Sequence, residues 1–189
     1  MLSISNFYDN VDAVREFALQ QSWRENPSHF PGKRTAPFLN DSTKELIQNA
    51  IRPLAGEVTW WGSTESGCFQ YTTAADRSWI HSDATTTWAG VIYLTPDAPL
   101  SAGTGIFRHK RTGLTSWVYS DHSPEETNSA PHATDSMDMT KWELVDRIGN
   151  VYNKLILYRG DLFHVSLDYF GKDMHDGRLF QTFFFNTEK

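Results

Sequence analysis

The chain has 189 residues, with 17 basic and 23 acidic side chains and a formal net charge of -6. No linker-like stretch divides it, so we expect one domain over residues 1–189. The basic residues are scattered, which argues against a nucleic-acid or membrane partner. Cys68 is the only cysteine, so neither an intrachain disulfide nor a thiolate zinc site can form, and we expect a cytoplasmic protein.

The N-terminal part, residues 1–56, is predicted to be a helical support. Apolar residues recur at helical spacing over residues 11–18, which predicts a first helix. A second helix is predicted to begin at residues 42–45, whose sequence S-T-K-E has the form of a capping box. Its apolar stripe covers residues 46–54, and Gly56 is expected to end it.

From residue 57 onward the pattern changes to short runs rich in Val, Ile, Thr and aromatic residues, separated by turn residues. This pattern is typical of a β-sandwich or barrel, so we expect a mostly β jelly-roll core over residues 57–189. Strands are predicted at residues 58–61, 68–72, 78–81, 87–94, 105–109, 115–118, 154–158, 163–165 and 178–185. Residues 141–148 fit either a strand or a helix. The polar residues 119–141 are predicted to form an insertion or a lid, because they are too long for a plain connector.

The segment His81-Ser82-Asp83 is the first candidate for a metal site. Residues i and i+2 of a strand project from the same face, so this imidazole and this carboxylate can converge on one ion. A chance polar pair at the end of a strand is the alternative interpretation. His164 is the best-placed third ligand, because it lies in an apolar strand where a histidine needs a partner. A hydrogen-bonded core histidine is the alternative there, and His109 is the strongest competitor for the ligand role.

Two imidazoles and one carboxylate suit non-heme Fe(II), because coordination positions remain open for a chelating co-substrate and dioxygen. Arg178 follows a turn and begins an apolar strand, so its planar guanidinium is a candidate for binding a carboxylate, with a surface salt bridge as the alternative. Tyr71 is the candidate second donor to that carboxylate, with a core tyrosine as the alternative. The candidate walls of the pocket are Trp79, Trp88, Tyr93 and Phe184.

The order of these segments resembles the Fe(II)/2-oxoglutarate-dependent oxygenase superfamily, and specifically its prolyl 4-hydroxylase-like branch, over residues 58–185. The sequence W-I-H-S-D at residues 79–83 resembles the strand with the first iron ligands. The sequences V-I-Y-L at 91–94 and G-T-G-I-F at 103–107 resemble the hairpin that follows it. His164 takes the place of the second histidine, and Gly177-Arg178-Leu179 is similar to the final strand, where a basic residue binds 2-oxoglutarate. Members often have a serine or threonine where this chain has Phe180.

The resemblance implies a double-stranded β-helix, a cupin-like jelly roll, with N-terminal supporting α-helices. It also implies a dioxygenase in which His81, Asp83 and His164 bind Fe(II) and Arg178 and Tyr71 bind the co-substrate 2-oxoglutarate. Such an enzyme hydroxylates a small-molecule or peptide substrate and releases succinate and CO2, with ascorbate as a candidate reductant. A homodimer is left open. The alternative functions are a cupin-like jelly roll that binds a small ligand without turnover and a structural jelly roll without metal.

Overall fold

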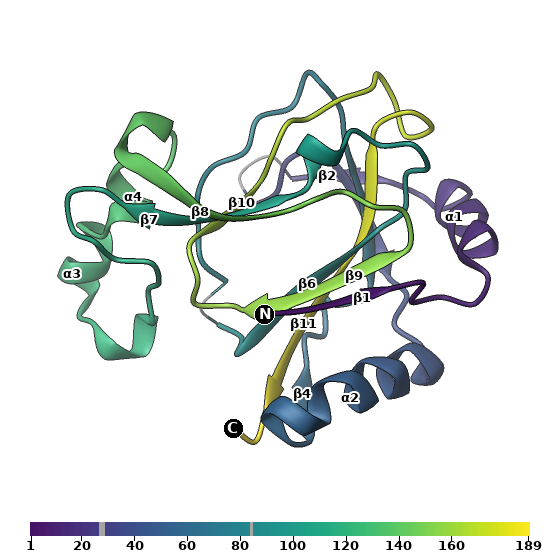
Figure 1. The fold of residues 1–189 in the computed structure, drawn as a ribbon, viewed down its shortest axis with the longest axis horizontal. Coiled ribbons are helices and arrows are strands. Elements are labelled where there is room, and N and C mark those ends of the chain that lie inside the picture. The colour runs from purple at the N-terminus through teal and green to yellow at the C-terminus, as the bar shows by residue number, and fades with distance from the viewer. Residues whose placement is uncertain (27–28, 84) are drawn as a thin grey trace.

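The computed structural model describes residues 1–26, 29–83 and 85–189, and its regular structure is mainly β-strand (Figure 1). The helices are α1 (Val11–Leu19), α2 (Asp41–Ala55), α3 (Pro124–Asn128) and α4 (Pro131–Thr134), with the short 3-10 turns η1 (Leu100–Ala102), η2 (Tyr119–Asp121) and η3 (Met139–Lys141). The strands are β1 (Leu2–Ser5), β2 (Arg24–Glu25), β3 (Lys33–Pro37), β4 (Val58–Trp61), β5 (Cys68–Thr72), β6 (Trp88–Tyr93), β7 (Thr104–His109), β8 (Trp142–Ile148), β9 (Lys154–Arg159), β10 (His164–Ser166) and β11 (Arg178–Thr187). No helix among these residues is long and apolar enough to cross a lipid bilayer.

The larger sheet joins segments from both ends of the chain. Its order is β1-β9-β6-β11-β5-β3-β2, and β4 pairs with β11 in addition. All of these pairings are antiparallel. The strands β1, β2 and β3 come from residues 1–56, so this segment is not only a helical support. It also supplies both ends of the sheet order (Figure 1).

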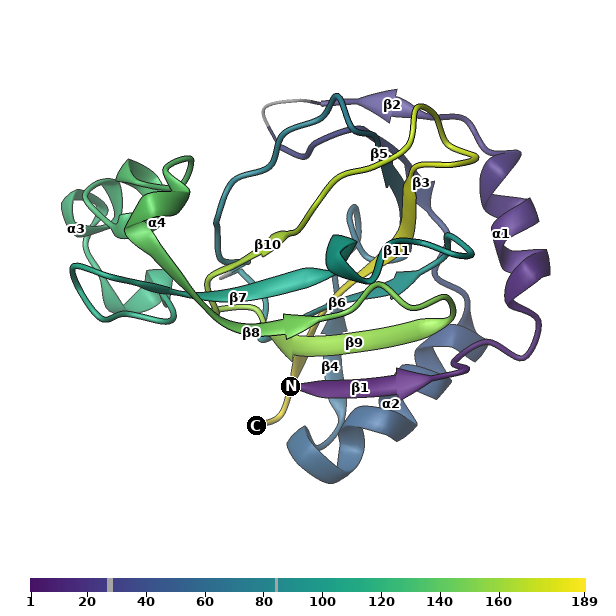
Figure 2. The same cartoon turned by 45° about the horizontal axis from the view of Figure 1, so that its top comes forward.

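The smaller sheet consists of β10, β7 and β8, and it faces the larger one (Figure 2). Val91 and Phe180 of the larger sheet line the same cavity as Thr104 and Ser166 of the smaller sheet. Two antiparallel sheets that enclose a cavity between them form the double-stranded β-helix, so the predicted fold class is confirmed.

Side chains alternate along β11 and separate two apolar cores. Leu179, Phe183 and Phe185 pack in the cluster that also contains buried residues of α1 and α2. Phe180 and Phe184 point the other way and line the cavity. Because successive side chains of a strand leave opposite faces, a strand this rich in phenylalanine is buried on both sides. The helices therefore cover the outer face of the larger sheet, and the inner face is left for a site.

Both predicted helices are present, but α2 begins differently from the prediction. The side-chain oxygen of Asn40 accepts a hydrogen bond from the amide of Thr43 (2.8 Å), so Asn40 is the N-cap. The predicted capping box at residues 42–45 was wrong, because Ser42 already lies inside the first turn. Gly56 ends the helix as predicted, with a φ of 77° that favours glycine.

Two predicted strands, at residues 78–81 and 115–118, do not form. Each makes only an isolated bridge, His81 with His164 and Ser116 with Leu162. The amide of Ile80 donates to the carbonyl of Ser136 (3.0 Å), so the other edge of the first segment meets a loop instead of a strand. The other predicted strands are confirmed to within two residues at their ends.

Of residues 141–148, which fitted either a strand or a helix, residues 142–148 form the edge strand β8. β8 pairs with β7 from Thr104↔Ile148 to His109↔Trp142, and this pairing decides the conformation. The preceding residues 119–141 contain η2, α3, α4 and η3 instead of a plain loop. This segment lies on the opposite side of the molecule from α1 in both views (Figures 1 and 2).

Candidate metal centre

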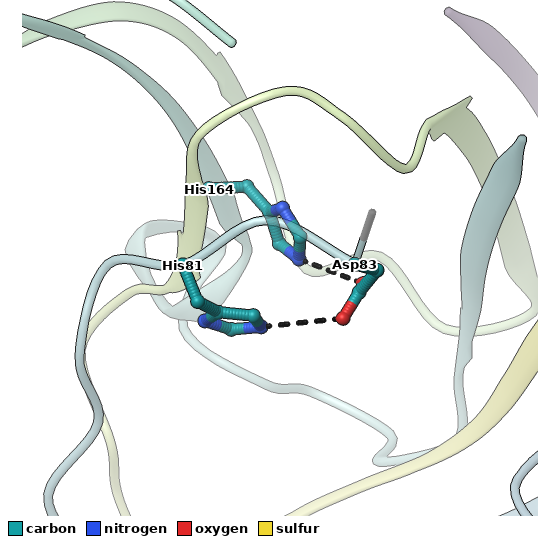
Figure 3. A group of neighbouring side chains, drawn as sticks. All are labelled: His81, Asp83 and His164. Atoms are coloured by element: carbon teal, nitrogen blue, oxygen red, sulfur yellow. Dashed lines mark ion pairs between the residues drawn. The ribbon is translucent and has the colours of Figure 1, made fainter. Parts of the chain in front are cut away.

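The structure brings His81, Asp83 and His164 together at the wall of the cavity (Figure 3). The Nε2 atom of His164 lies 3.2 Å from one carboxylate oxygen of Asp83, and the Nε2 atom of His81 lies 3.7 Å from the other. The backbone explains this convergence. The amide of His81 donates to the carbonyl of His164 (3.1 Å) and the amide of His164 donates to that of His81 (2.9 Å), so the two imidazoles leave adjacent positions.

Both imidazoles are held in the same way, and this orientation suits metal ligation. The Nδ1 atom of His81 lies 2.9 Å from the carbonyl oxygen of Trp79, and the Nδ1 atom of His164 lies 2.9 Å from that of Leu162. A carbonyl oxygen only accepts, so each Nδ1 must carry the proton and donate it. Each Nε2 is therefore directed at Asp83, where it can bind a proton or a metal ion. Backbone carbonyls that fix the tautomer of a histidine are typical partners of metal-ligating histidines.

The electrostatics of the three side chains favour a cation. Burial and the neighbouring imidazole of His164 lower the pKa of His81. Burial by itself raises the pKa of Asp83, but the charge and hydrogen bond of His164 outweigh it, so this pKa is lowered. Burial in turn lowers the pKa of His164, and the carboxylate of Asp83 outweighs that effect and raises it. A divalent cation would therefore replace a proton shared between Asp83 and His164.

The cavity beside these side chains has a volume of about 380 Å³. This is within the usual range for small-molecule sites. Trp79 and Phe184 line it, as predicted for pocket walls, and so does Tyr158, whose ring centroid lies 4.7 Å from that of His164. Trp88 was predicted as a further wall, but it packs in the core on the helix side of β6.

Arg178 points toward the inner face of β11 and is 1% exposed. Its Nε donates to the carbonyl of Ala102 (2.9 Å), its Nη2 donates to that of Gly103 (3.4 Å), and its Nη1 has no hydrogen-bond partner among the described residues. No carboxylate of the described chain forms an ion pair with it, so the predicted alternative of a surface salt bridge does not hold. A buried guanidinium with a free N–H group is suited to an anionic ligand.

Arg178 is not itself part of the cavity lining, but two hydroxyl groups connect it to the cavity. Thr104 lines the cavity, and its hydroxyl lies 2.8 Å from that of Tyr93. The guanidinium carbon of Arg178 lies 5.4 Å from the centre of the Tyr93 ring and 4.3 Å from that of Phe180. Tyr93 was expected as a wall of the pocket, but it is not among the residues that line the cavity, and Thr104 was not predicted at all. The sequence signal for both is their position on the two strands that follow His81-Ser82-Asp83. These strands, β6 and β7, lie in different sheets, so they do not form the hairpin that the resemblance implied.

Tyr71 is not brought to the cavity, so its predicted role as second carboxylate donor is not supported by its position. Its neighbour Gln70 lines the cavity, and alternation along β5 therefore directs Tyr71 to the opposite face. There its ring packs edge-on against Trp23, with 4.9 Å between the ring centroids. Tyr71 is half-buried and packs against the core on that face, which fits the alternative of a core tyrosine.

His109, the strongest competitor for the ligand role, has a different task. It is fully buried, with Nδ1 3.0 Å from the hydroxyl of Thr112 and Nε2 3.1 Å from the carboxylate of Asp135. It thus fastens the segment of residues 119–141 to β7. Within residues 1–26, 29–83 and 85–189, the group of His81, Asp83 and His164 is the one cluster with metal-ligand spacing.

Comparisons with solved structures support this fold. HygX from Streptomyces hygroscopicus, crystallised with nickel, 2-oxoglutarate and hygromycin B bound, superimposes with a TM-score of 0.62 at 10% identity, over 99% of this chain and 82% of that chain. A prolyl hydroxylase from Trichoplax adhaerens, in complex with a hypoxia inducible factor peptide fragment, gives 0.57 at 11% identity, over 99% and 83%. A prolyl-4-hydroxylase from Pseudomonas putida gives 0.50 at 13% identity, over 100% and 92%.

The molecule therefore shares the fold of these three proteins, the double-stranded β-helix that the sequence predicted. The chain belongs to the family of unknown function DUF6445, whose sequence pattern matches residues 1–185. A search of the curated proteins found no match.

Proposed function

We propose that this protein is an Fe(II)- and 2-oxoglutarate-dependent dioxygenase that hydroxylates a small-molecule or peptide substrate, with succinate and CO2 as co-products. The observation that carries the proposal is the convergence of the Nε2 atoms of His81 and His164 on the carboxylate of Asp83, beside a cavity of about 380 Å³. Neighbours with the same fold hold nickel and 2-oxoglutarate together with hygromycin B, or bind a peptide.

In the proposed site, His81, Asp83 and His164 hold the metal. Carbonyl groups of Trp79 and Leu162 keep both imidazoles in the tautomer that presents Nε2 to the cavity. Fe(II) bound by one carboxylate keeps a net positive charge and open coordination positions, so it can bind an anionic 2-oxo acid and activate dioxygen. The three side chains would hold the ion at the wall of the cavity, and the cavity would leave room for the ligands that occupy its open positions.

For the distal carboxylate of 2-oxoglutarate, the proposed partners are Arg178, Tyr93 and Thr104. The unpaired Nη1 of Arg178 can donate to it, and the hydroxyl groups of Tyr93 and Thr104 can add neutral donors. Burial keeps water from competing for these bonds, so each is stronger than it would be at the surface. This arrangement assigns the second donor to Tyr93 instead of Tyr71.

The test is turnover of 2-oxoglutarate in aerobic solution with Fe(II) and ascorbate, measured as succinate formed. Wild-type protein and the control variant His175→Ala, whose side chain is exposed, are expected to form succinate. His81→Ala and His164→Ala are expected to form none. Equal succinate production by His164→Ala and wild type would refute the proposed site.

The same measurements separate the alternative function. A jelly roll that only binds a small acidic ligand would show saturable binding without a metal ion and release no succinate in air. A structural jelly roll would bind neither.

A further inference from the structure

Arg34 places a buried positive charge on the wall of the same cavity. It lies on β3, opposite Gln70 of β5, and is 9% exposed. Its Nε and Nη2 both donate to the side-chain oxygen of Gln70, at 2.9 and 2.6 Å. The amide nitrogen of Gln70 donates to the carbonyl of Pro31 (2.7 Å), and the Arg34 guanidinium lies 4.2 Å from the centre of the Phe30 ring. These contacts fix the guanidinium in one orientation.

Glu65 provides a negative charge directly beside it. Its carboxylate accepts a hydrogen bond from the Nη1 of Arg34. The two partners differ in exposure, because the side chain of Arg34 is 11% exposed and that of Glu65 is 43% exposed. Glu65 lies in the turn between β4 and β5, so it can move more freely than Arg34. The pair therefore combines a rigid cation with an adaptable anion.

This ion pair lies in the same cavity as the proposed metal ligands. Arg34, Glu65, His81, Asp83 and His164 all line it, and Arg34 is the one arginine or lysine among the lining residues described. The guanidinium is near enough to Asp83 to help lower the pKa of that carboxyl, after the larger effects of His164 and His81 and against the effect of burial, which raises it. Burial lowers the pKa of Arg34 itself to about 10, so it stays charged at neutral pH.

Arg34 has N–H groups that can still donate hydrogen bonds to a ligand. The hydrogen bonds to Gln70 and Glu65 use Nε and one N–H each of Nη1 and Nη2, which leaves one N–H on each terminal nitrogen. An ion pair with one half-exposed partner contributes little net stability, because water weakens the attraction between the two charges. A simple structural role is therefore a weak explanation for this pair on the wall of a cavity.

We propose that Arg34 and Glu65 bind the carboxylate and the ammonium group of a free α-amino acid, which is the primary substrate. This inference rests on the proposed function and names the substrate class for it. An α-amino acid carries adjacent charges of opposite sign, so it pairs with Arg34 and Glu65 and leaves no charge unpaired. A monoanion would instead place its own carboxylate and that of Glu65 against one guanidinium. A neutral ligand would cover Arg34 and Glu65 without offering either a group of opposite charge.

The experiment uses the full chain loaded with Mn(II) and 2-oxoglutarate without oxygen, and measures binding by calorimetry. The probes are an equimolar mixture of the protein amino acids, then each amino acid separately, and the matching N-acetyl acids and amino acid amides. We expect at least one free amino acid to bind. The N-acetyl acid and the amide of that amino acid are expected to bind roughly tenfold or more weakly, since each lacks one of the two charges.

Variants test the two side chains separately. Glu65→Gln keeps the shape of the side chain and is expected to weaken binding of the amino acid roughly tenfold, and Arg34→Met is expected to weaken it roughly ten- to hundredfold. Arg108 and Glu143 form an exposed ion pair on the smaller sheet, so Arg108→Met and Glu143→Gln are matched controls and should bind like wild type. Thermal unfolding of each variant shows whether it is folded.

The inference is overturned if wild-type protein binds Mn(II) and 2-oxoglutarate but no free amino acid. It is also overturned if the N-acetyl acid or the amide binds as tightly as the free amino acid, or if folded Glu65→Gln binds like wild type. Failure of the proposed function has a different signature, because wild-type protein would then show no metal-dependent binding of 2-oxoglutarate.

Discussion

Replacement of Arg178 by methionine is expected to weaken co-substrate binding strongly and to change the stability of the fold only slightly. In most proteins, loss of a fully buried, hydrogen-bonded arginine is strongly destabilising, because its partners are left unsatisfied. Here both acceptors keep another donor. The carbonyl of Ala102 also accepts from the side chain of Asn150 (3.2 Å), and the carbonyl of Gly103 also accepts from the amide of Leu167 (2.9 Å).

The opposing contributions to stability are similar in size. The variant loses the hydrogen bond to Ala102, which has a charged donor and contributes about 1.5–3 kcal/mol, and the longer, weaker one to Gly103. It also loses contacts with two aromatic rings, which contribute about 0.5–2 kcal/mol. The variant no longer buries a charge that has no counter-ion in the described chain. Removing that cost stabilises the folded state by several kcal/mol. We therefore expect the free energy of unfolding of Arg178→Met to lie within about 1 kcal/mol of the wild-type value.

The affinity for 2-oxoglutarate should change far more. Loss of a charge-assisted hydrogen bond to its carboxylate costs about 1.5–3 kcal/mol, which weakens binding roughly ten- to hundredfold. Calorimetry with Mn(II)-loaded protein measures the affinity, and urea denaturation without metal measures the stability. Arg147→Met, which removes an exposed arginine near Asp168, is the control for both. A folded Arg178→Met protein with wild-type affinity, or one destabilised by more than about 3 kcal/mol, would refute this reasoning.

Further substitutions test other parts of the structure. Tyr93→Phe is expected to weaken 2-oxoglutarate binding by about 1 kcal/mol, whereas Tyr71→Phe should leave it unchanged. If calorimetry shows a larger loss of affinity for Tyr71→Phe than for Tyr93→Phe, Tyr71 is the second donor after all. Because Asn40 caps α2, Asn40→Ala should lower the free energy of unfolding by about 1 kcal/mol and Ser42→Ala by less than about 0.5 kcal/mol. Urea denaturation measures both values, and equal effects of the two substitutions would contradict this cap. Gly103→Ala should cost more than about 3 kcal/mol, because a Cβ there would overlap a backbone oxygen of β8, and a wild-type melting temperature would show that this close approach is wrong.

Much of the fold could be predicted from local patterns. Short β-branched and aromatic runs predicted most strands, because residues that fit a pleated surface also recur with its periodicity. The strand predictions failed where partners distant in the sequence decide the backbone conformation. The segment ending at His81 finds a loop on one side and a single bridge on the other, and residues 142–148 become a strand because β7 lies beside them. No local pattern contains that information.

For the candidate site, the sequence by itself determined the chemical types of the ligand set. His81 and Asp83 are two residues apart in the chain, and His164 is a polar residue within an apolar run. These properties belong to the chain whatever its fold. The tertiary structure decided the rest: the orientation of both imidazoles by backbone carbonyls, the choice of Gln70 over Tyr71 for the cavity, and the meeting of Arg34 with Glu65. Strand alternation fixes which residues share a face, but when both faces are apolar only packing against the helices decides which face is left to line the cavity.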